Sequence, residues 1–200
     1  MPPRSRREHG EPLEVQAARE RQRHVGQVTS YGYFARRGPK RHVTVTPRPL
    51  RWWQYDLARP WVFAVTVLAV AAWLAYLGWR DGAGAAADEA PLAVLLGVVV
   101  LVGATGRFTI SDHAVSTDIA GLRQTSSFGV VPLVLVSDVV EGRPPAGWPR
   151  PRNRGGWWPG RRRINVRHLH TDGVTDKAFT VWVRDPAAVA GALGHPLGRT

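Results

Sequence analysis

The sequence predicts an α+β membrane protein, in which a two-helix transmembrane hairpin is followed by a small antiparallel β-domain closed by a C-terminal helix. Three observations lead to this fold class: two long uncharged apolar runs, short alternating segments after them, and an Asp-Pro pair that begins the last apolar segment. The chain has 200 residues and a net charge of +12, so the apolar runs stand out within a basic protein. We divide it into a basic, largely disordered tail (1–59), the hairpin (60–106) and the β-domain (107–200).

The first apolar run, 61–79, contains no charged residue. A helix of this length rises about 28 Å, which matches the hydrocarbon thickness of a bilayer. Aromatic residues lie near both of its ends: Trp52, Trp53, Tyr55 and Trp61 on one side, and Trp73, Tyr76 and Trp79 on the other. Such rings are typical of the two membrane interfaces. The alternative is a buried helix of a soluble protein, which needs more surrounding protein than this chain supplies.

The second run, 90–106, is a shorter candidate for a membrane span. Asp88 and Glu89 precede it, where carboxylates suit a helix N-terminus, and Pro91 suits the first turn. The link 80–89 is short, so we expect an antiparallel helical hairpin. The alternative for this run is a re-entrant or interfacial segment.

Charge predicts the orientation of the hairpin. Thirteen Lys and Arg residues precede the first span, one lies in the link, and thirteen follow the second span. We expect the hairpin to lie in the inner (plasma) membrane. The positive-inside rule then places both termini in the cytoplasm. Neither run contains Asp, Glu, Lys, Arg or His, which argues against an ion path or proton relay inside the hairpin.

The tail 1–59 holds thirteen Lys and Arg residues against five Asp and Glu. Residues 11–25 allow one short helix with a poor apolar stripe, and the remainder lacks a sustained period, which indicates disorder. A basic segment beside a membrane attracts anionic lipid. The other interpretation is that these charges only set topology and solubility.

Alternating apolar residues after the hairpin predict short strands at 108–110, 115–119, 122–128, 130–140, 163–170 and 179–183. Pro132 interrupts the fourth of these, which indicates a strand end or a bulge there. Asp185 and Pro186 then begin a short helix through Leu193, and Gly194 suits its C-terminal cap.

Three stretches carry a resemblance to a known family: RFTISDHAVSTDIAGLRQTSSF, VPLVLVSDVVE and AFTVWVRDPAAVAGALG. With the hairpin, over residues 50–194, the chain resembles the bacterial pleckstrin-homology-like (PH-like) membrane proteins that are common in actinobacteria. The resemblance implies a PH-like β-domain that acts as a membrane-bound binding or scaffolding module without chemistry of its own. The segment 142–160 departs from the family pattern as a long insertion.

The loop 141–163 carries the candidate binding residues, which are arginines and tryptophans: Arg150, Arg152, Arg154, Trp157, Trp158, Arg161, Arg162 and Arg163. Guanidinium groups bind phosphates through forked donors, and indoles favour membrane interfaces. A loop this long within a small domain is either functional or disordered. We therefore consider three ligands for this loop: anionic lipid headgroups, an acidic protein partner and, as the least favoured, single-stranded nucleic acid. The alternative is that the loop is only a solvated linker.

Other patterns give no chemistry. His168 and His170 share one face of a predicted strand and, with Asp172, allow a metal site, but structural histidines explain them better. The absence of cysteine excludes disulfides, thiolate metal sites and a cysteine nucleophile. We find no catalytic motif and expect a non-enzymatic protein without metal or cofactor. The alternatives are an accessory subunit of a larger membrane complex, an unrecognised enzyme, or a nucleic-acid-binding membrane protein.

Overall fold

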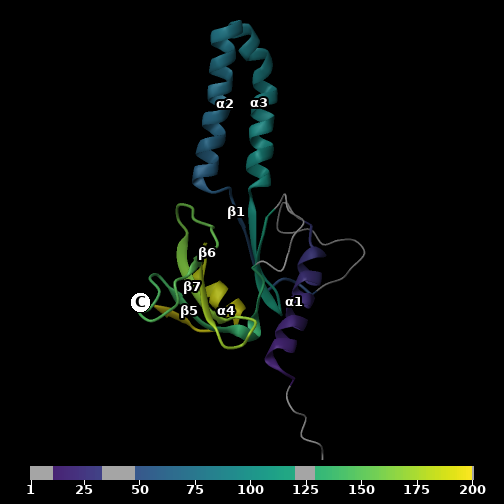
Figure 1. The fold of residues 1–200 in the computed structure, drawn as a ribbon, viewed down its shortest axis with the longest axis vertical. Coiled ribbons are helices and arrows are strands. Elements are labelled where there is room, and N and C mark those ends of the chain that lie inside the picture. Colours follow the sequence, from purple (N-terminus) through teal and green to yellow (C-terminus); the bar gives the residue numbers. More distant parts are fainter. Residues whose placement is uncertain (1–10, 33–47, 120–128, 200) are drawn as a thin grey trace, which may run out of the picture.

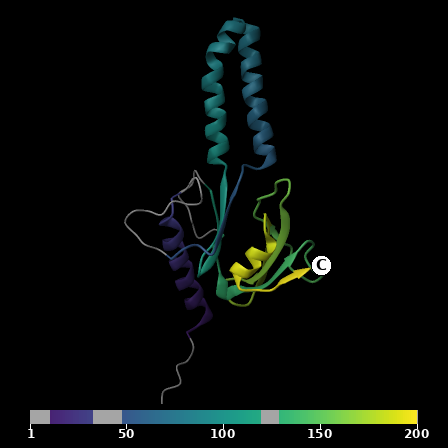
Figure 2. The same cartoon turned by 180° about the vertical axis from the view of Figure 1, so that it is seen from behind.

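The computed structural model describes residues 11–32, 48–119 and 129–199. Two long helices project from one end of a β-domain built from two sheets, and a further helix lies along one side of it (Figure 1). Seen from behind, the short helix near the C-terminus lies against the strands of the β-domain (Figure 2). The predicted strand 122–128 falls outside the described residues.

The projecting hairpin consists of α2 (Pro60–Asp81) and α3 (Ala83–Gly103), and both helices are long and apolar enough to cross a membrane. The link is shorter than the sequence predicts. Gly82 alone joins the helices. Its φ of 89° is positive, and residues that carry a side chain rarely adopt such a backbone conformation. Asp88, Glu89 and Pro91 consequently lie inside α3 and do not mark its start, because the alanine-rich segment before them has high helix propensity.

The hairpin is inserted into the first sheet. Strand β1 (Trp52–Asp56) precedes α2, and β2 (Gly106–Ile110) follows α3. The two strands pair antiparallel, with Asp56 opposite Gly106 at the hairpin end and Trp52 opposite Ile110 at the other. The first sheet continues through β3 (Ala114–Ile119) to β4 (Val131–Pro132), in the order β1-β2-β3-β4.

Pro132 ends the first sheet, as its missing N–H predicts. The short 3₁₀ turn η1 (Leu133–Leu135) then carries the chain into a second sheet, which contains β5 (Val136–Glu141), β6 (Arg152–Asn153), β7 (Arg162–Leu169), β8 (Asp176–Val183) and β9 (Leu197–Arg199). The order is β6-β8-β7-β5-β9, with β5, β7 and β8 antiparallel and both edge strands parallel to their neighbours. The apolar segment 130–140 is thus two strands in different sheets.

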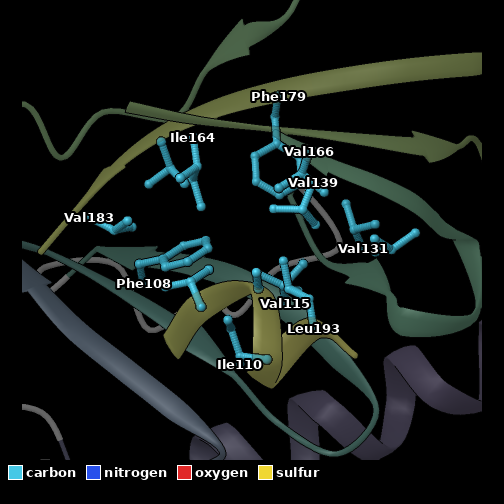
Figure 3. Close-up of a cluster of buried hydrophobic side chains, with 14 residues drawn as sticks. Phe108, Ile110, Val115, Val131, Val139, Ile164, Val166, Phe179, Val183 and Leu193 are labelled. Atoms are coloured by element: carbon cyan, nitrogen blue, oxygen red, sulfur yellow. The ribbon is translucent and has the colours of Figure 1, made fainter. Parts of the chain in front are cut away.

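The two sheets enclose an apolar core, which Figure 3 shows in close-up. Phe108, Ile110 and Val115 come from the first sheet and face Ile164 and Phe179 of the second. Helix α4 (Pro186–Leu193) closes the core, and it is the helix that the sequence predicts. The Asp185 carboxylate accepts a hydrogen bond from the Ala188 N–H at 3.0 Å, and Gly194 ends the helix in the left-handed conformation.

Helix α1 (Leu13–Thr29) packs on the outer face of the first sheet through a buried histidine. The two ring nitrogens of His24 lie 2.8 Å from the hydroxyls of Ser111 and Ser116. Ser116 donates to Asp118, which also forms a buried ion pair with Arg107. Burial lowers the pKa of His24 to about 4, with smaller contributions from His113 and Arg107, so the histidine is uncharged at neutral pH.

Two parts of the segment 1–59, which the sequence predicts to be largely disordered, are therefore ordered. Helix α1 extends four residues beyond the predicted segment 11–25, and its anchor to the sheet is polar, which a search for an apolar stripe does not detect. Strand β1 includes Trp52, Trp53 and Tyr55, which the sequence predicts to lie at a membrane interface. Trp52 instead packs edge-on against Phe108 in the core, with ring centroids 5.6 Å apart. Residues 1–10 and 33–47 lie outside the described residues.

Candidate functional site

A cavity of about 530 Å³ lies where the two sheets separate, between the β4 edge of the first sheet and the β6 edge of the second. Its apolar floor comes from Val130, Val131, Leu135 and Phe179, all of which are buried. The ends of β7 and β8 and one residue of α1 complete the wall. The cavity thus draws on both sheets and on the N-terminal helix.

The lining is strongly basic. Five permanently cationic side chains contribute to it: Arg21, Arg150, Arg152, Arg154 and Lys177. Within the described part of the chain, the lining includes no Asp or Glu. Arg150, Arg152 and Lys177 are exposed and form no ion pair with any described carboxylate within 4.0 Å. Such an uncompensated group of cations around a concave surface attracts anions.

Arg154 bridges the two sheets at this cavity. Its guanidinium donates a short hydrogen bond to the Gly129 carbonyl, two residues before β4, and its central carbon lies 4.0 Å from the centre of the Phe179 ring. The backbone N–H of Arg154 donates to the Thr180 carbonyl of β8 at 2.8 Å. Burial, together with the charge of Arg152, lowers the pKa of Arg154 to about 10, so it remains charged at neutral pH.

Both histidines of the predicted strand line the cavity. His168 Nδ1 lies 2.8 Å from the Leu169 carbonyl, which can only accept, so Nδ1 carries a proton and donates to it. Burial lowers the pKa of His168, and the charges of Arg154 and Lys177 lower it further. Asp172 does not join the pair, because its carboxylate accepts from the backbone N–H groups of Val174 and Thr175 in the turn.

The second half of the candidate loop turns away from the cavity and contacts β1. The Arg161 guanidinium forms a buried ion pair with Asp56 and donates to the carbonyls of Tyr55 and Gly156, each at 2.8 Å. The Gln54 amide also donates to Asp56 at 2.7 Å. Burial raises the pKa of Asp56, while Gln54 and Arg161 oppose this shift. Arg161 therefore fixes the loop to β1. Its guanidinium is buried there, which contradicts the prediction that Arg161 contacts an anionic surface.

The remaining predicted residues fall into three groups. Arg163 is half-buried and lies 3.4 Å from the Thr180 hydroxyl, so it too faces the sheet. Arg162 is exposed and pairs with Glu141 at 3.4 Å. Trp157 and Trp158 are exposed, at 50% and 36% respectively. Of the eight predicted residues, the structure brings only Arg150, Arg152 and Arg154 together at the cavity.

Sequence reasoning missed Arg21 and Lys177. Arg21 lies on α1, more than a hundred residues before the loop, and only the docking of that helix brings it to the cavity. Its buried Nε has no hydrogen-bond partner among the described residues. Lys177 lies at the start of β8, opposite His168 in the register of the sheet. A β-hairpin prediction for 163–183 would have placed these two residues as neighbours.

In the described part of the chain, no three His, Asp or Glu side chains come together as metal ligands. The chemistry that the site supports is binding of an anion, through forked guanidinium donors and an ammonium group above an apolar floor. Comparisons with family models, with curated proteins and with solved structures gave no match to this chain.

Proposed function

We propose that this protein is a non-enzymatic inner-membrane protein, in which the α2–α3 hairpin is the anchor and the β-domain is a PH-like binding module for a phosphate-bearing anion. The length and hydropathy of the two helices support the membrane anchor. The even distribution of Lys and Arg on both sides of the hairpin supports cytoplasmic termini. Two sheets closed by a C-terminal helix support the PH-like assignment.

One observation carries the choice of ligand. The cavity collects five permanent positive charges, and its described lining holds no carboxylate to neutralise them. Phosphate groups suit this arrangement because an arginine fork matches two of their oxygens. The phosphate has two candidate sources, a lipid headgroup and a soluble or protein-borne group, and both share this chemistry.

Calorimetric titration of the full-length protein with pyrophosphate, in nanodiscs of neutral lipid, tests the proposal. Arg152→Ala and Lys177→Ala should each weaken binding about tenfold or more, since a charge-assisted hydrogen bond contributes roughly 1.5–3 kcal/mol. Arg162→Ala is the matched control, because this exposed arginine lies on the same sheet outside the cavity. Binding should also weaken as salt is raised.

Absence of pyrophosphate binding, or an equal loss in the Arg162→Ala control, would refute the proposal. Replacing the neutral lipid by phosphatidylglycerol distinguishes the two sources of phosphate. If phosphatidylglycerol headgroups reach the cavity, they compete with pyrophosphate for the cavity residues, and pyrophosphate binds more weakly than in neutral lipid. A cavity that takes a soluble or protein-borne phosphate binds pyrophosphate in both lipids.

A further inference from the structure

The loop 155–161, which we call the tryptophan loop, exposes two large indoles that are neighbours in the sequence. Trp157 is 50% and Trp158 is 36% exposed, and the hydrophobic core uses neither ring. A turn closes the loop after them, in which the Arg161 N–H donates to the Trp158 carbonyl at 3.1 Å and Gly160 has a φ of 80°. An ordered loop that presents apolar rings to solvent indicates a contact surface.

The tryptophan loop is fixed at the hairpin end of the β-domain. Arg161 binds Asp56, which is the last residue of β1 and lies shortly before the first residue of α2. Gly156 packs against the same place: a Cβ there would lie 2.7 Å from the Trp182 carbonyl and 3.1 Å from the Asp56 carboxylate. Because no side chain fits at Gly156, the loop contacts the base of the hairpin closely.

Exposed apolar residues of the hairpin base continue this surface. Leu57 is 56% exposed and directly follows Asp56, just as Trp157 directly follows Gly156. Trp61, in the first turn of α2, is 62% exposed. Exposed apolar residues thus flank the Arg161–Asp56 ion pair on both segments and continue into α2. Indole rings favour the headgroup layer of a bilayer, where the ring is desolvated and its N–H stays hydrated.

We propose that the tryptophan loop inserts into the interfacial layer of the same bilayer that holds the hairpin, and so docks the β-domain on the membrane surface. This inference rests on the proposed membrane anchor.

Site-specific fluorescence in a chain without native cysteine tests the docking. A nitrobenzoxadiazole label on Pro159→Cys keeps both tryptophans and reports on the tip of the loop. A label on Val174→Cys, 83% exposed at the far end of the sheet, is the matched control, and one on Leu96→Cys reports insertion of α3. The full-length protein is placed in nanodiscs whose lipids carry nitroxide quenchers, either on the headgroup or deep in the acyl chain.

We expect quenching of the Pro159→Cys label by headgroup nitroxides, quenching of the Leu96→Cys label by acyl-chain nitroxides, and no quenching of the Val174→Cys label. Adding Trp157→Ala and Trp158→Ala should reduce the loop signal to the level of the Val174→Cys control. If the Leu96→Cys label is quenched and the loop label is not, the docking is refuted while the membrane anchor stands. If the Leu96→Cys label is not quenched, the anchor itself fails.

Discussion

Acidification should loosen helix α1 from the first sheet, because the docked helix buries an uncharged histidine. His24 is fully buried between the Ser111 and Ser116 hydroxyls, and its pKa is lowered to about 4. When the helix leaves the sheet, the imidazole returns to water and regains its ordinary pKa near 6.5. Protons therefore bind more tightly to the undocked state, and the histidine favours undocking as the pH falls from 6.5 towards 4.

The size of this effect follows from the two pKa values. Between pH 7 and pH 5 the docked state should lose about 2 kcal/mol, which corresponds to about a 20-fold larger undocked population. Above pH 7 the docking free energy should stay constant, because His24 is then neutral in both states. Asp118 acts in the opposite direction: burial raises its pKa, so proton uptake by this carboxyl favours the docked helix.

Thiol labelling of a single introduced cysteine measures the docking. Val28 is 1% exposed on α1, so Val28→Cys is labelled only when the helix lifts. Val15→Cys, at an exposed position of the same helix, corrects for the effect of pH on thiol reactivity. Because Asp118 opposes the effect of His24, the ratio of the two labelling rates should rise by at most about 20-fold from pH 7 to pH 5.

His24→Asn removes the titrating ring and keeps Asp118, so its labelling ratio should lose this rise. The comparison uses the slope with pH, because the substitution also changes the docking free energy itself. A flat ratio in the protein with His24, or an equal slope in His24→Asn, would show that the histidine does not control the docking.

Three further outcomes are expected. Arg161→Met should destabilise the protein by about 3–5 kcal/mol because it leaves the Asp56 carboxylate buried without its partner, whereas Arg162→Met should cost less than about 1 kcal/mol, as compared by chemical denaturation. Asp185→Ala should cost about 1 kcal/mol through the lost helix cap, and a Tm equal to that of the parent protein would contradict this. Replacing residues 59–104 by a short Gly-rich turn should give a water-soluble β-domain with unchanged strand content by circular dichroism, since β1 and β2 already pair as antiparallel neighbours; aggregation or loss of strand signal would argue against it.

Local signals in the sequence predicted the elements whose structure is decided locally. These signals depend only on neighbouring residues in the chain. They are the long apolar runs, the alternation along β7 and β8, and the cap residues Asp185 and Gly194. The break at Pro132 was predicted for the same reason. The sequence does not show that this break moves the chain from one sheet to the other, because that depends on which strands β4 and β5 pair with.

Long-range contacts account for the elements that sequence reasoning missed. Strand β1 has its partner on the far side of the hairpin, so its aromatic residues were interpreted as part of a membrane interface. The candidate site shows the same division. Arginine content marked the loop 141–163, but the loop alone does not reveal that Arg161 has a buried carboxylate partner in β1, or that α1 contributes Arg21 to the cavity.

Placing the hairpin between two paired strands ties the movements of its helices to the β-domain. Residues 57–59 join β1 to α2, and residues 104–105 join α3 to β2, so both connections are short. The ladder from Asp56 opposite Gly106 to Trp52 opposite Ile110 fixes the two strands against sliding. A displacement of one helix along its axis relative to the other would shear this ladder before it could be absorbed elsewhere. Sliding of one helix past the other is therefore resisted by the hydrogen bonds between β1 and β2, which couples the hairpin to the first sheet.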